Sequence, residues 1–124
     1  MRAFRQAIEA RDLAAVALLL ADDVVFHSPV SHKPHRGRDQ VGWILATVAT
    51  VFEDFAYIDE LEHGGHSALR FTAHIGDRQL EGLDLIELDA AGQIAKLTVM
   101  VRPLSGLQAL AEAMAVRFAS RGTP

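Results

Sequence analysis

Apolar residues recur at helical spacing near the start, in the middle and at the end of the chain. This pattern predicts helices over residues 2–11, 13–20, 38–52 and 104–118. Asp12 stands directly before the second helix, where an N-cap residue belongs. That helix, LAAVALLL, is apolar nearly all round, so we expect it to be buried.

Elsewhere the spacing of apolar residues shortens to two. A β-branched run at 24–28 predicts a short strand that stops at Pro29, followed by a loop over 30–37. Beyond Phe55 the alternation predicts four more strands, over 56–63, 67–75, 79–89 and 93–102. The order of elements predicts one α+β domain, residues 1–124, with helices packed on one face of a curved antiparallel sheet.

Turn lengths assign the strand side chains to two faces of the sheet. A two-residue turn at Gly76-Asp77 pairs Ile75 with Arg78, and a symmetric turn at 89–92 pairs Leu88 with Gln93. With these pairings, one face is mostly apolar and the other is mostly polar and is expected to meet solvent. The apolar face holds Leu69, Phe71, Ala73, Ile75, Leu80, Gly82, Ile86, Ala95, Leu97, Val99 and Val101.

Asp84 is the one ionisable residue on this apolar face. Burial disfavours a charged carboxylate, so an apolar setting raises the pKa of a carboxyl. Asp84 would then stay protonated near neutral pH and serve as a general acid or hydrogen-bond donor. Two structural alternatives stay open. In the first, the side chain of Asp84 accepts a hydrogen bond from a backbone amide and has no chemical role. In the second, a one-residue bulge turns Asp84 to the polar face, where it forms a salt bridge with Arg70.

Composition narrows the classes of function. The chain has 124 residues, half of them hydrophobic, which suits one globular domain with its own core. A net charge of −4 with scattered basic residues gives no basic face for nucleic acid. No apolar run in the sequence is long enough for a membrane span or a signal peptide, and cysteine is absent. We expect a cytoplasmic protein without nucleic-acid or membrane partners.

Three histidines stand close together in VVFHSPVSHKPHRGR, residues 24–38. A metal site needs about three convergent ligands, often including a carboxylate. His27 points away from Ser28 on the same strand, and His32 and His35 fall in the predicted loop. We therefore predict no metal and no cofactor. An alternative left open is that His32 or His35 reaches the mouth of a pocket as a base.

Two segments resemble ketosteroid isomerases of the nuclear transport factor 2-like (SnoaL-like) superfamily. The first, AIEARDLAAVALLLADDVVFHSPVSHKPHRG, has the acidic break and the proline corner before the long helix. The second, GLDLIELDAAGQIAKLTV, has the aspartate and Gly-x-Ile of the late hairpin. The resemblance covers about residues 4–45 and 82–99. It implies a cone-like curved sheet that closes over helices around a deep apolar pocket.

The resemblance also implies where the polar groups of an isomerase would lie. The general base falls at Ser28, the oxyanion-hole tyrosine at Phe4 and a supporting tyrosine at Leu45. The protonated aspartate of the late hairpin, a known hydrogen-bond donor in those enzymes, is retained as Asp84. A serine cannot shuttle the proton without another base. We therefore do not expect classical ketosteroid isomerase activity.

Two related chemistries also keep an aspartate at this hairpin. Limonene-type epoxide hydrolases add an arginine and a second aspartate, where this chain has Gly82 and, approximately, Val99, so we do not expect epoxide hydrolysis. SnoaL-type polyketide cyclases resemble the chain without that conflict. The resemblance implies a cofactor-independent isomerase or cyclase for a small hydrophobic molecule, with Asp84 as its catalytic residue. The expected substrate contacts are Phe4, Ser28, Trp43, Leu45, Phe71, Gly82, Leu97, Val99 and Val101.

Two non-enzymatic functions stay open beside the enzyme. One is a binder of a hydrophobic ligand, and the other is a structural dimer module whose cavity is filled by Phe4, Trp43 and Phe71. The helix over 104–118 is an addition to the isomerase pattern that either caps the pocket or packs on a partner subunit. Superfamily members are commonly dimers, so we expect a homodimer.

Overall fold

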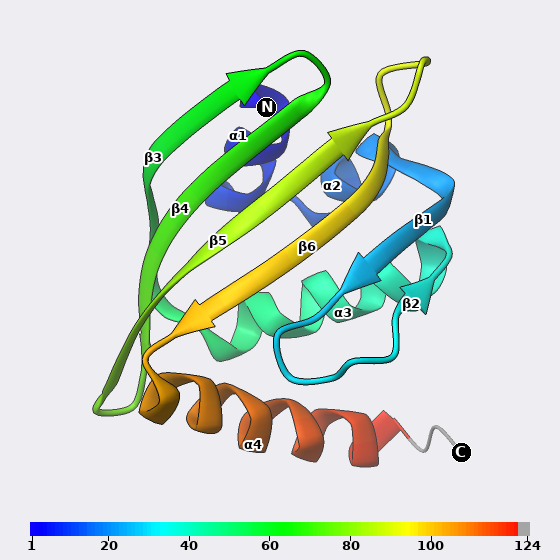
Figure 1. Ribbon diagram of the computed structural model, residues 1–124. Coiled ribbons are helices and arrows are strands. Elements are labelled where there is room, and N and C mark those ends of the chain that lie inside the picture. Colours follow the sequence, from blue (N-terminus) through cyan, green and yellow to red (C-terminus); the bar gives the residue numbers. More distant parts are fainter. Residues whose placement is uncertain (122–124) are drawn as a thin grey trace.

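The computed structural model describes residues 1–121 of the chain. Two short helices come first and are followed by a strand, a very short strand and a long helix. Four long strands and a last helix complete the fold (Figure 1). In chain order the elements are α1 (Arg2–Glu9), α2 (Leu13–Leu19), β1 (Leu20–His27), β2 (His35–Arg36), α3 (Arg38–Val51), β3 (Glu53–His63), β4 (His66–Ile75), β5 (Arg78–Leu88), β6 (Ile94–Arg102) and α4 (Leu104–Arg121).

The strands form one curled sheet in the order β2-β1-β6-β5-β4-β3. Neighbouring strands run antiparallel, except that β1 and β6 are parallel. Figure 1 shows α1, α2 and α3 behind the sheet and α4 along its lower end. The predicted α+β fold, with helices on one face and an added C-terminal helix, is confirmed. Among the helices of residues 1–121, none has the length and hydropathy to cross a membrane.

Local interactions explain why α2 and α3 begin where they do. The side chain of Asp12 accepts a hydrogen bond of 3.1 Å from the amide of Ala15, as expected of an N-cap residue. Gly37 precedes α3 with a φ of 93°, a conformation that favours glycine. The guanidinium of Arg38 then donates two hydrogen bonds, of 3.1 and 2.8 Å, to the carbonyl of Leu20. The start of α3 is thereby tied to the start of β1.

Two element boundaries differ from the prediction. The predicted loop over 30–37 is wrong at His35–Arg36, which pair with β1 as a short strand. The strand expected to begin at residue 24 begins at Leu20 instead. Asp22 and Asp23 are exposed in a stretch where the register of β1 against β6 shifts. These two polar residues interrupt the apolar pattern of the strand, so the sequence indicated a later start.

The hairpin between β4 and β5 has the predicted register. Ile75 lies opposite Arg78, and Phe71 lies opposite Gly82. Because side chains alternate between the two faces of a strand, this pairing places Asp84 on the same face as Phe71. That face is the concave one, against which the helices pack, so the ion pair of Asp84 with Arg70 is excluded. Arg70 bonds Asp59 on the convex side.

The predicted register of the next hairpin is wrong by two residues. Ile86 lies opposite Leu97 rather than Ala95, and Asp84 lies opposite Val99. A bulge where β5 ends takes up the difference. Because the shift is two residues, Leu97 and Val99 stay on their predicted face. At the bulge itself, Ile94 is the fully buried residue, in the place predicted for Ala95.

Gly82 provides the space in which the ring of Phe71 lies against the sheet. A Cβ on Gly82 would stand 2.4 Å from Cζ of Phe71 and 2.5 Å from the carbonyl oxygen of Met100. The backbone oxygen cannot turn away, so the substitution Gly82→Ala forces both neighbours to move. We expect this variant to lose roughly 1–3 kcal/mol of unfolding free energy in urea denaturation.

The matched control is Gly42→Ala in the middle of α3, where a Cβ would meet no atom within 4 Å. Alanine favours a helix over glycine, so this variant should be as stable as the wild type or slightly more stable. Equal stability of the two alanine variants would contradict the close packing of Phe71 on Gly82.

Candidate functional site

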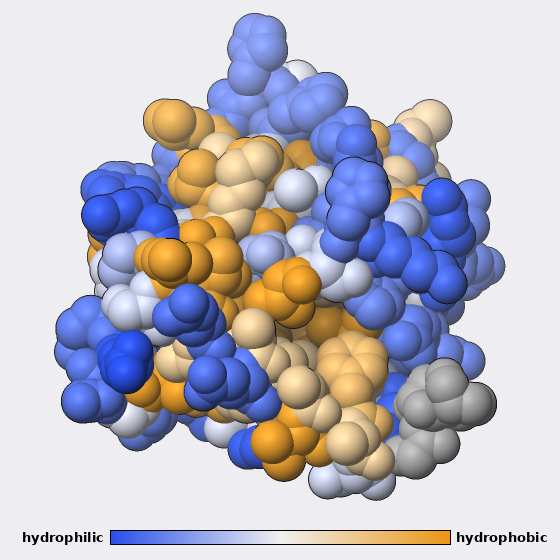
Figure 2. Space-filling model, turned by 60° about the horizontal axis from the view of Figure 1, so that its bottom comes forward, coloured by the Kyte–Doolittle hydropathy of each residue, from blue (hydrophilic) through white to orange (hydrophobic). Residues whose placement is uncertain are grey.

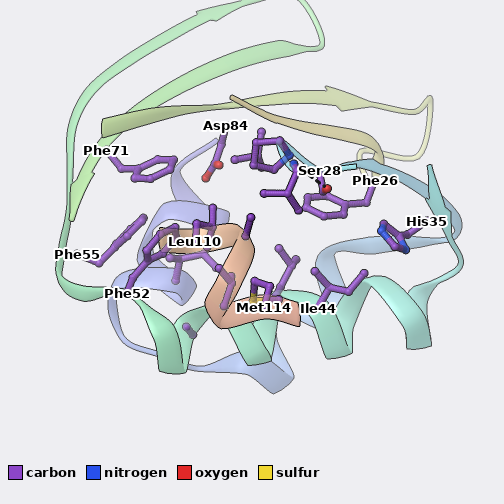
Figure 3. A pocket seen from close by; sticks show the side chains of 18 of the residues that line it. Phe26, Ser28, His35, Ile44, Phe52, Phe55, Phe71, Asp84, Leu110 and Met114 are labelled. Carbon is purple, nitrogen blue, oxygen red and sulfur yellow. Dashed lines mark hydrogen bonds between the residues drawn. The ribbon is translucent and has the colours of Figure 1, made fainter. Parts of the chain in front are cut away.

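A cavity of about 420 Å³, called here the central cavity, lies between the concave face of the sheet and the helices. Figure 3 shows the lining side chains converging from the sheet above and from α3 and α4 below. Its walls are almost wholly apolar. They include Phe4, Phe26, Ile44, Leu45, Val48, Phe52, Phe55, Phe71, Val99, Leu110 and Met114.

Few polar side chains interrupt this apolar lining. They are Arg11, Ser28, Ser31, His35, Tyr57 and Asp84. Of these, Tyr57 and Asp84 are buried, whereas Arg11 and Ser31 are exposed. A ligand in the central cavity would therefore meet hydrocarbon on most sides and a small number of hydrogen-bonding groups.

Asp84 projects from the middle of β5 into the central cavity (Figure 3). The hydroxyl of Tyr57, on β3, donates a hydrogen bond of 2.5 Å to Oδ2 of Asp84. Within residues 1–121 this is the single hydrogen bond that the carboxyl makes to another protein group. One carboxyl oxygen is thus engaged by the protein, and the other is available to a ligand.

The apolar surroundings change the acidity of both groups. Burial raises the pKa of Asp84 to about 7, although the hydrogen bond from Tyr57 acts in the opposite direction. Burial also raises the pKa of Tyr57, and the nearby Asp84 raises it further. Tyr57 therefore remains a neutral donor, while Asp84 gains and loses its proton near neutral pH.

Sequence reasoning missed Tyr57. It is the only tyrosine of the chain, and its partner is 27 residues away. The alternation of side chains along a strand could have indicated its position, since Phe55 and Tyr57 are two residues apart on one strand and so share a face. Their rings meet edge to face with centroids 4.9 Å apart. Phe71 joins them, its centroid 5.0 Å from that of Phe55, and the cluster forms one wall of the central cavity.

The structure brings some of the expected substrate contacts to the cavity and leaves others away from it. Those that line the central cavity are Phe4, Ser28, Leu45, Phe71 and Val99. Those that do not line it are Trp43, Gly82, Leu97 and Val101. Gly82 lies under the ring of Phe71, and Leu97 is fully buried in the core.

Trp43 departs furthest from its predicted place. It lies on the side of α3 that faces α4, edge to face with Phe118 at a centroid distance of 5.0 Å. The guanidinium of Arg121 stands 4.1 Å from the centre of its ring. Its aromatic surface is therefore used between two helices, and Phe118 takes the position at the cavity wall.

Helix α4 covers one side of the central cavity. Leu110, Met114 and Phe118 follow one another at helical spacing and line it. Gly106 lets the helix approach β5 closely, since a Cβ there would stand 2.7 Å from Cβ of Leu80. Figure 2 shows this side of the molecule, where apolar residues gather around the centre of the face. The helix therefore lies over the pocket, which is one of the two predicted placements, and its packing on a partner subunit stays a prediction.

The three histidines of the sequence motif separate in the structure. His35 lines the central cavity, whereas His27 and His32 do not. The ring of His35 lies between Phe26 and Phe118, with centroid distances of 6.2 and 6.0 Å. Burial, together with the charge of Lys33, lowers the pKa of His35. Among residues 1–121, no group of three or more acidic, histidine or cysteine side chains could hold a metal ion.

Comparison with known proteins agrees with this architecture. A sequence model described as SnoaL-like domain matches residues 1–97. No curated protein sequence matches the chain. A solved steroid delta-isomerase from Pseudomonas aeruginosa is 48% identical, with a TM-score of 0.91 over 95% of this chain and 88% of that one.

Two further solved structures extend the comparison. An uncharacterized protein with a cystatin-like fold from Silicibacter pomeroyi is 34% identical, with a TM-score of 0.90 over 94% of this chain and 82% of that one. A putative ketosteroid isomerase from Kribbella flavida shares the fold at 21% identity, with a TM-score of 0.69 over 82% of this chain and 74% of that one.

Proposed function

Because this chain belongs to the SnoaL-like domain family, we propose that its central cavity binds a small hydrophobic molecule on which Asp84 acts as a general acid or hydrogen-bond donor. The reaction is of the isomerase or cyclase type and needs no cofactor. The observation that carries the proposal is a protonatable carboxyl on the wall of an otherwise apolar cavity.

The size and lining of the central cavity support binding of such a molecule. A volume of about 420 Å³ falls within the roughly 300–1,000 Å³ of pockets that hold small organic ligands. Apolar surface that leaves water on binding supplies the affinity, and one polar group fixes the orientation. The expected ligand is a compact, mostly hydrocarbon molecule with an oxygen atom that accepts a hydrogen bond from Asp84.

The arrangement of Tyr57 and Asp84 supports a role in catalysis. The bond from Tyr57 occupies Oδ2, so a proton on Oδ1 can point at the ligand. A carbonyl oxygen that gains negative charge during the reaction would be stabilised by this donor. The effect is larger in an apolar cavity than in water because less solvent screens it. An acid with a pKa of about 7 is well matched to proton transfer near neutral pH.

A steroid is a reasonable first probe, since the Pseudomonas aeruginosa protein that is 48% identical to this chain is a steroid delta-isomerase. Progesterone serves to measure binding, and 5-androstene-3,17-dione serves to measure isomerisation. Turnover of the second steroid by the wild type would overturn the expectation, drawn from Ser28, that classical ketosteroid isomerase activity is absent. We expect progesterone to raise the melting temperature of the wild-type protein in a concentration-dependent way.

The variant Asp84→Asn separates catalysis from binding. We expect it to lose roughly 10²–10⁴-fold in turnover, because asparagine cannot transfer a proton. Its affinity for progesterone should fall by about tenfold or less, since only one hydrogen bond changes. The matched control is Asp23→Asn, an exposed change on β1 that should leave both measurements unaltered. Unchanged turnover in Asp84→Asn would contradict the catalytic role.

A second function, binding without catalysis, is favoured by the extent of the apolar lining. In that case progesterone stabilises both the wild type and Asp84→Asn, and neither converts the isomerisation substrate. A structural module would show no thermal response to any apolar probe. The homodimer is a separate proposal, which light scattering behind a size-exclusion column tests directly.

A further inference from the structure

The central cavity reaches the surface beside a permanent positive charge. Helix α1 and the turn after it contribute three lining residues, which are Phe4, Ile8 and Arg11. Phe4 is buried, Ile8 is half-buried and Arg11 is exposed, so this wall of the cavity leads from the core to solvent. The other exposed residues of the lining carry no charge. They are Val30, Ser31 and Ala115.

We propose that the central cavity takes a hydrophobic carboxylic acid and that Arg11 binds its carboxylate at the rim. The apolar part of this ligand lies within the cavity, among the aromatic and aliphatic side chains. At the rise of a helix, the stretch from Phe4 to Arg11 is about 10 Å long, which suits a medium-length alkyl chain. This inference rests on the function proposed above and gives the expected ligand a second polar end.

The guanidinium of Arg11 is not occupied by an acidic side chain. Among residues 1–121, none forms an ion pair with it. The acidic residues nearest in sequence, Glu9 and Asp12, have other partners. Glu9 lies 3.5 Å from Arg5, and Asp12 accepts the hydrogen bond of the Ala15 amide. Because a guanidinium presents its N–H donors in a planar fork that matches a carboxylate, Arg11 can bind a ligand carboxylate through two parallel hydrogen bonds.

The other basic side chains near the central cavity are less suited to an anion. His35 is the other basic residue of the lining, and burial together with the charge of Lys33 lowers its pKa, which favours the neutral ring. Arg5 stands over the ring of Tyr57, 6.0 Å from its centre, but pairs with Glu60 and does not line the cavity. Arg11 is therefore the permanent positive charge that an anionic ligand meets within the part of the chain that the structure describes.

The backbone at Arg11 gives independent support for a role of its side chain. Arg11 has a φ of 55°, in the left-handed region that favours glycine. Its amide bonds the carbonyl of Ile8 at 3.0 Å, and the amide of Asp12 bonds the carbonyl of Ala7 at 2.9 Å. These two bonds form a Schellman motif, in which the residue at this position is usually glycine. An arginine here costs stability, as expected of a side chain retained for function.

Isothermal titration calorimetry with decanoate and decan-1-ol tests the proposal, because the two probes share an alkyl chain and differ in charge. At about pH 6, decanoate is ionised, whereas the carboxyl of Asp84, with a pKa of about 7, is mostly neutral. We expect Arg11→Gln to bind decanoate about tenfold more weakly than the wild type does, since a hydrogen-bonded charge pair is lost. Its affinity for decan-1-ol should stay within about twofold of the wild type.

Three further variants separate charge from folding. Arg11→Lys keeps the positive charge and should bind decanoate within about threefold of the wild type. Arg11→Gly should bind decanoate as weakly as Arg11→Gln does, yet melt at a higher temperature than the wild type, because glycine suits the left-handed backbone. Arg2→Gln is the matched control. It removes an exposed arginine of α1 that does not line the cavity, and it should bind both probes as the wild type does.

The results distinguish the role of Arg11 from the function on which it rests. Decanoate binding by Arg11→Gln within about twofold of the wild type, or an equal loss in Arg2→Gln, would overturn the role of Arg11. So would a wild type that binds decan-1-ol and progesterone but not decanoate. In each of these cases the apolar cavity and the role of Asp84 would stand. Failure of the wild type to bind decanoate, decan-1-ol and progesterone would overturn both proposals.

Discussion

The unfolding free energy of Asp84→Asn minus that of the wild type should rise by about 4 kcal/mol as the pH increases from about 4 to about 7, because the wild type loses stability over this range. The pKa of Asp84 is about 7 in the folded protein against 3.8 for an unperturbed group. Between these values the folded state keeps its proton while the unfolded state releases it. Each pH unit in that window therefore lowers the stability of the wild type by about 1.4 kcal/mol.

The sign of this effect is opposite to that of most carboxyl groups. A carboxyl with a lowered pKa stabilises the fold above its unfolded pKa, whereas Asp84 contributes most below about pH 4 and least above about pH 7. Asparagine does not titrate. The difference in unfolding free energy between variant and wild type should therefore rise with pH and become constant above about pH 7.

Urea denaturation at a series of pH values from about 4 to about 9 measures this difference. The control is Asp23→Asn, where an exposed carboxyl is replaced and the difference from the wild type should stay nearly constant with pH. A flat difference for Asp84→Asn would mean that the carboxyl is well solvated in the native protein. The apolar setting on which its proposed chemistry depends would then be wrong.

This pH dependence connects the stability of the protein to its proposed activity. The charged form of Asp84 destabilises the fold, and the neutral form is the one that can donate to a ligand. Functional sites often retain such groups although an uncharged residue would be more stable. Activity that depends on the neutral carboxyl should accordingly decline above about pH 7, which gives the alkaline limb of a pH profile.

The position of Asp84 could be predicted because it depends on local features alone. Strand side chains alternate, and the turn at Gly76 is a tight two-residue loop, so the register of β4 against β5 follows from counting. The next hairpin has a longer turn and a bulge, which residue counting does not detect. The error was an even number of residues, so Val99 kept its face and lines the cavity.

The places of Tyr57, His35 and Trp43 did not follow from local patterns, because they depend on the tertiary fold. The register of β3 against β4 contains two irregularities, so alternation alone does not place Tyr57 beside Asp84. His35 lies in a segment rich in proline and polar residues, and only its two-residue pairing with β1 turns it toward the cavity. For Trp43, helical spacing gives the face of α3 but not the element that covers it, which is α4.

The substitution Phe71→Ala should lower the unfolding free energy by about 3–5 kcal/mol. Phe71 is fully buried, and its ring centroid lies 5.6 Å from that of Phe52 and 5.0 Å from that of Phe55. Truncation removes these contacts and enlarges the central cavity at the wall beside Asp84, because neighbouring rings relax only partly. Urea denaturation measures the loss. The control Thr72→Ala changes the next residue, which points to the convex face, and should lose less than about 1 kcal/mol.

A double-mutant cycle with Gly82→Ala tests whether Phe71 acts through the contact seen in the structure. In the wild type the added Cβ meets both the ring of Phe71 and the carbonyl of Met100. In the Phe71→Ala background the first obstacle is gone, so Gly82→Ala should be less destabilising there by about 0.5–3 kcal/mol. Strictly additive losses would show that the ring does not rest on Gly82. The shape of the cavity wall beside Asp84 would then differ from the one described, because the ring of Phe71 forms part of that wall and lies against Gly82.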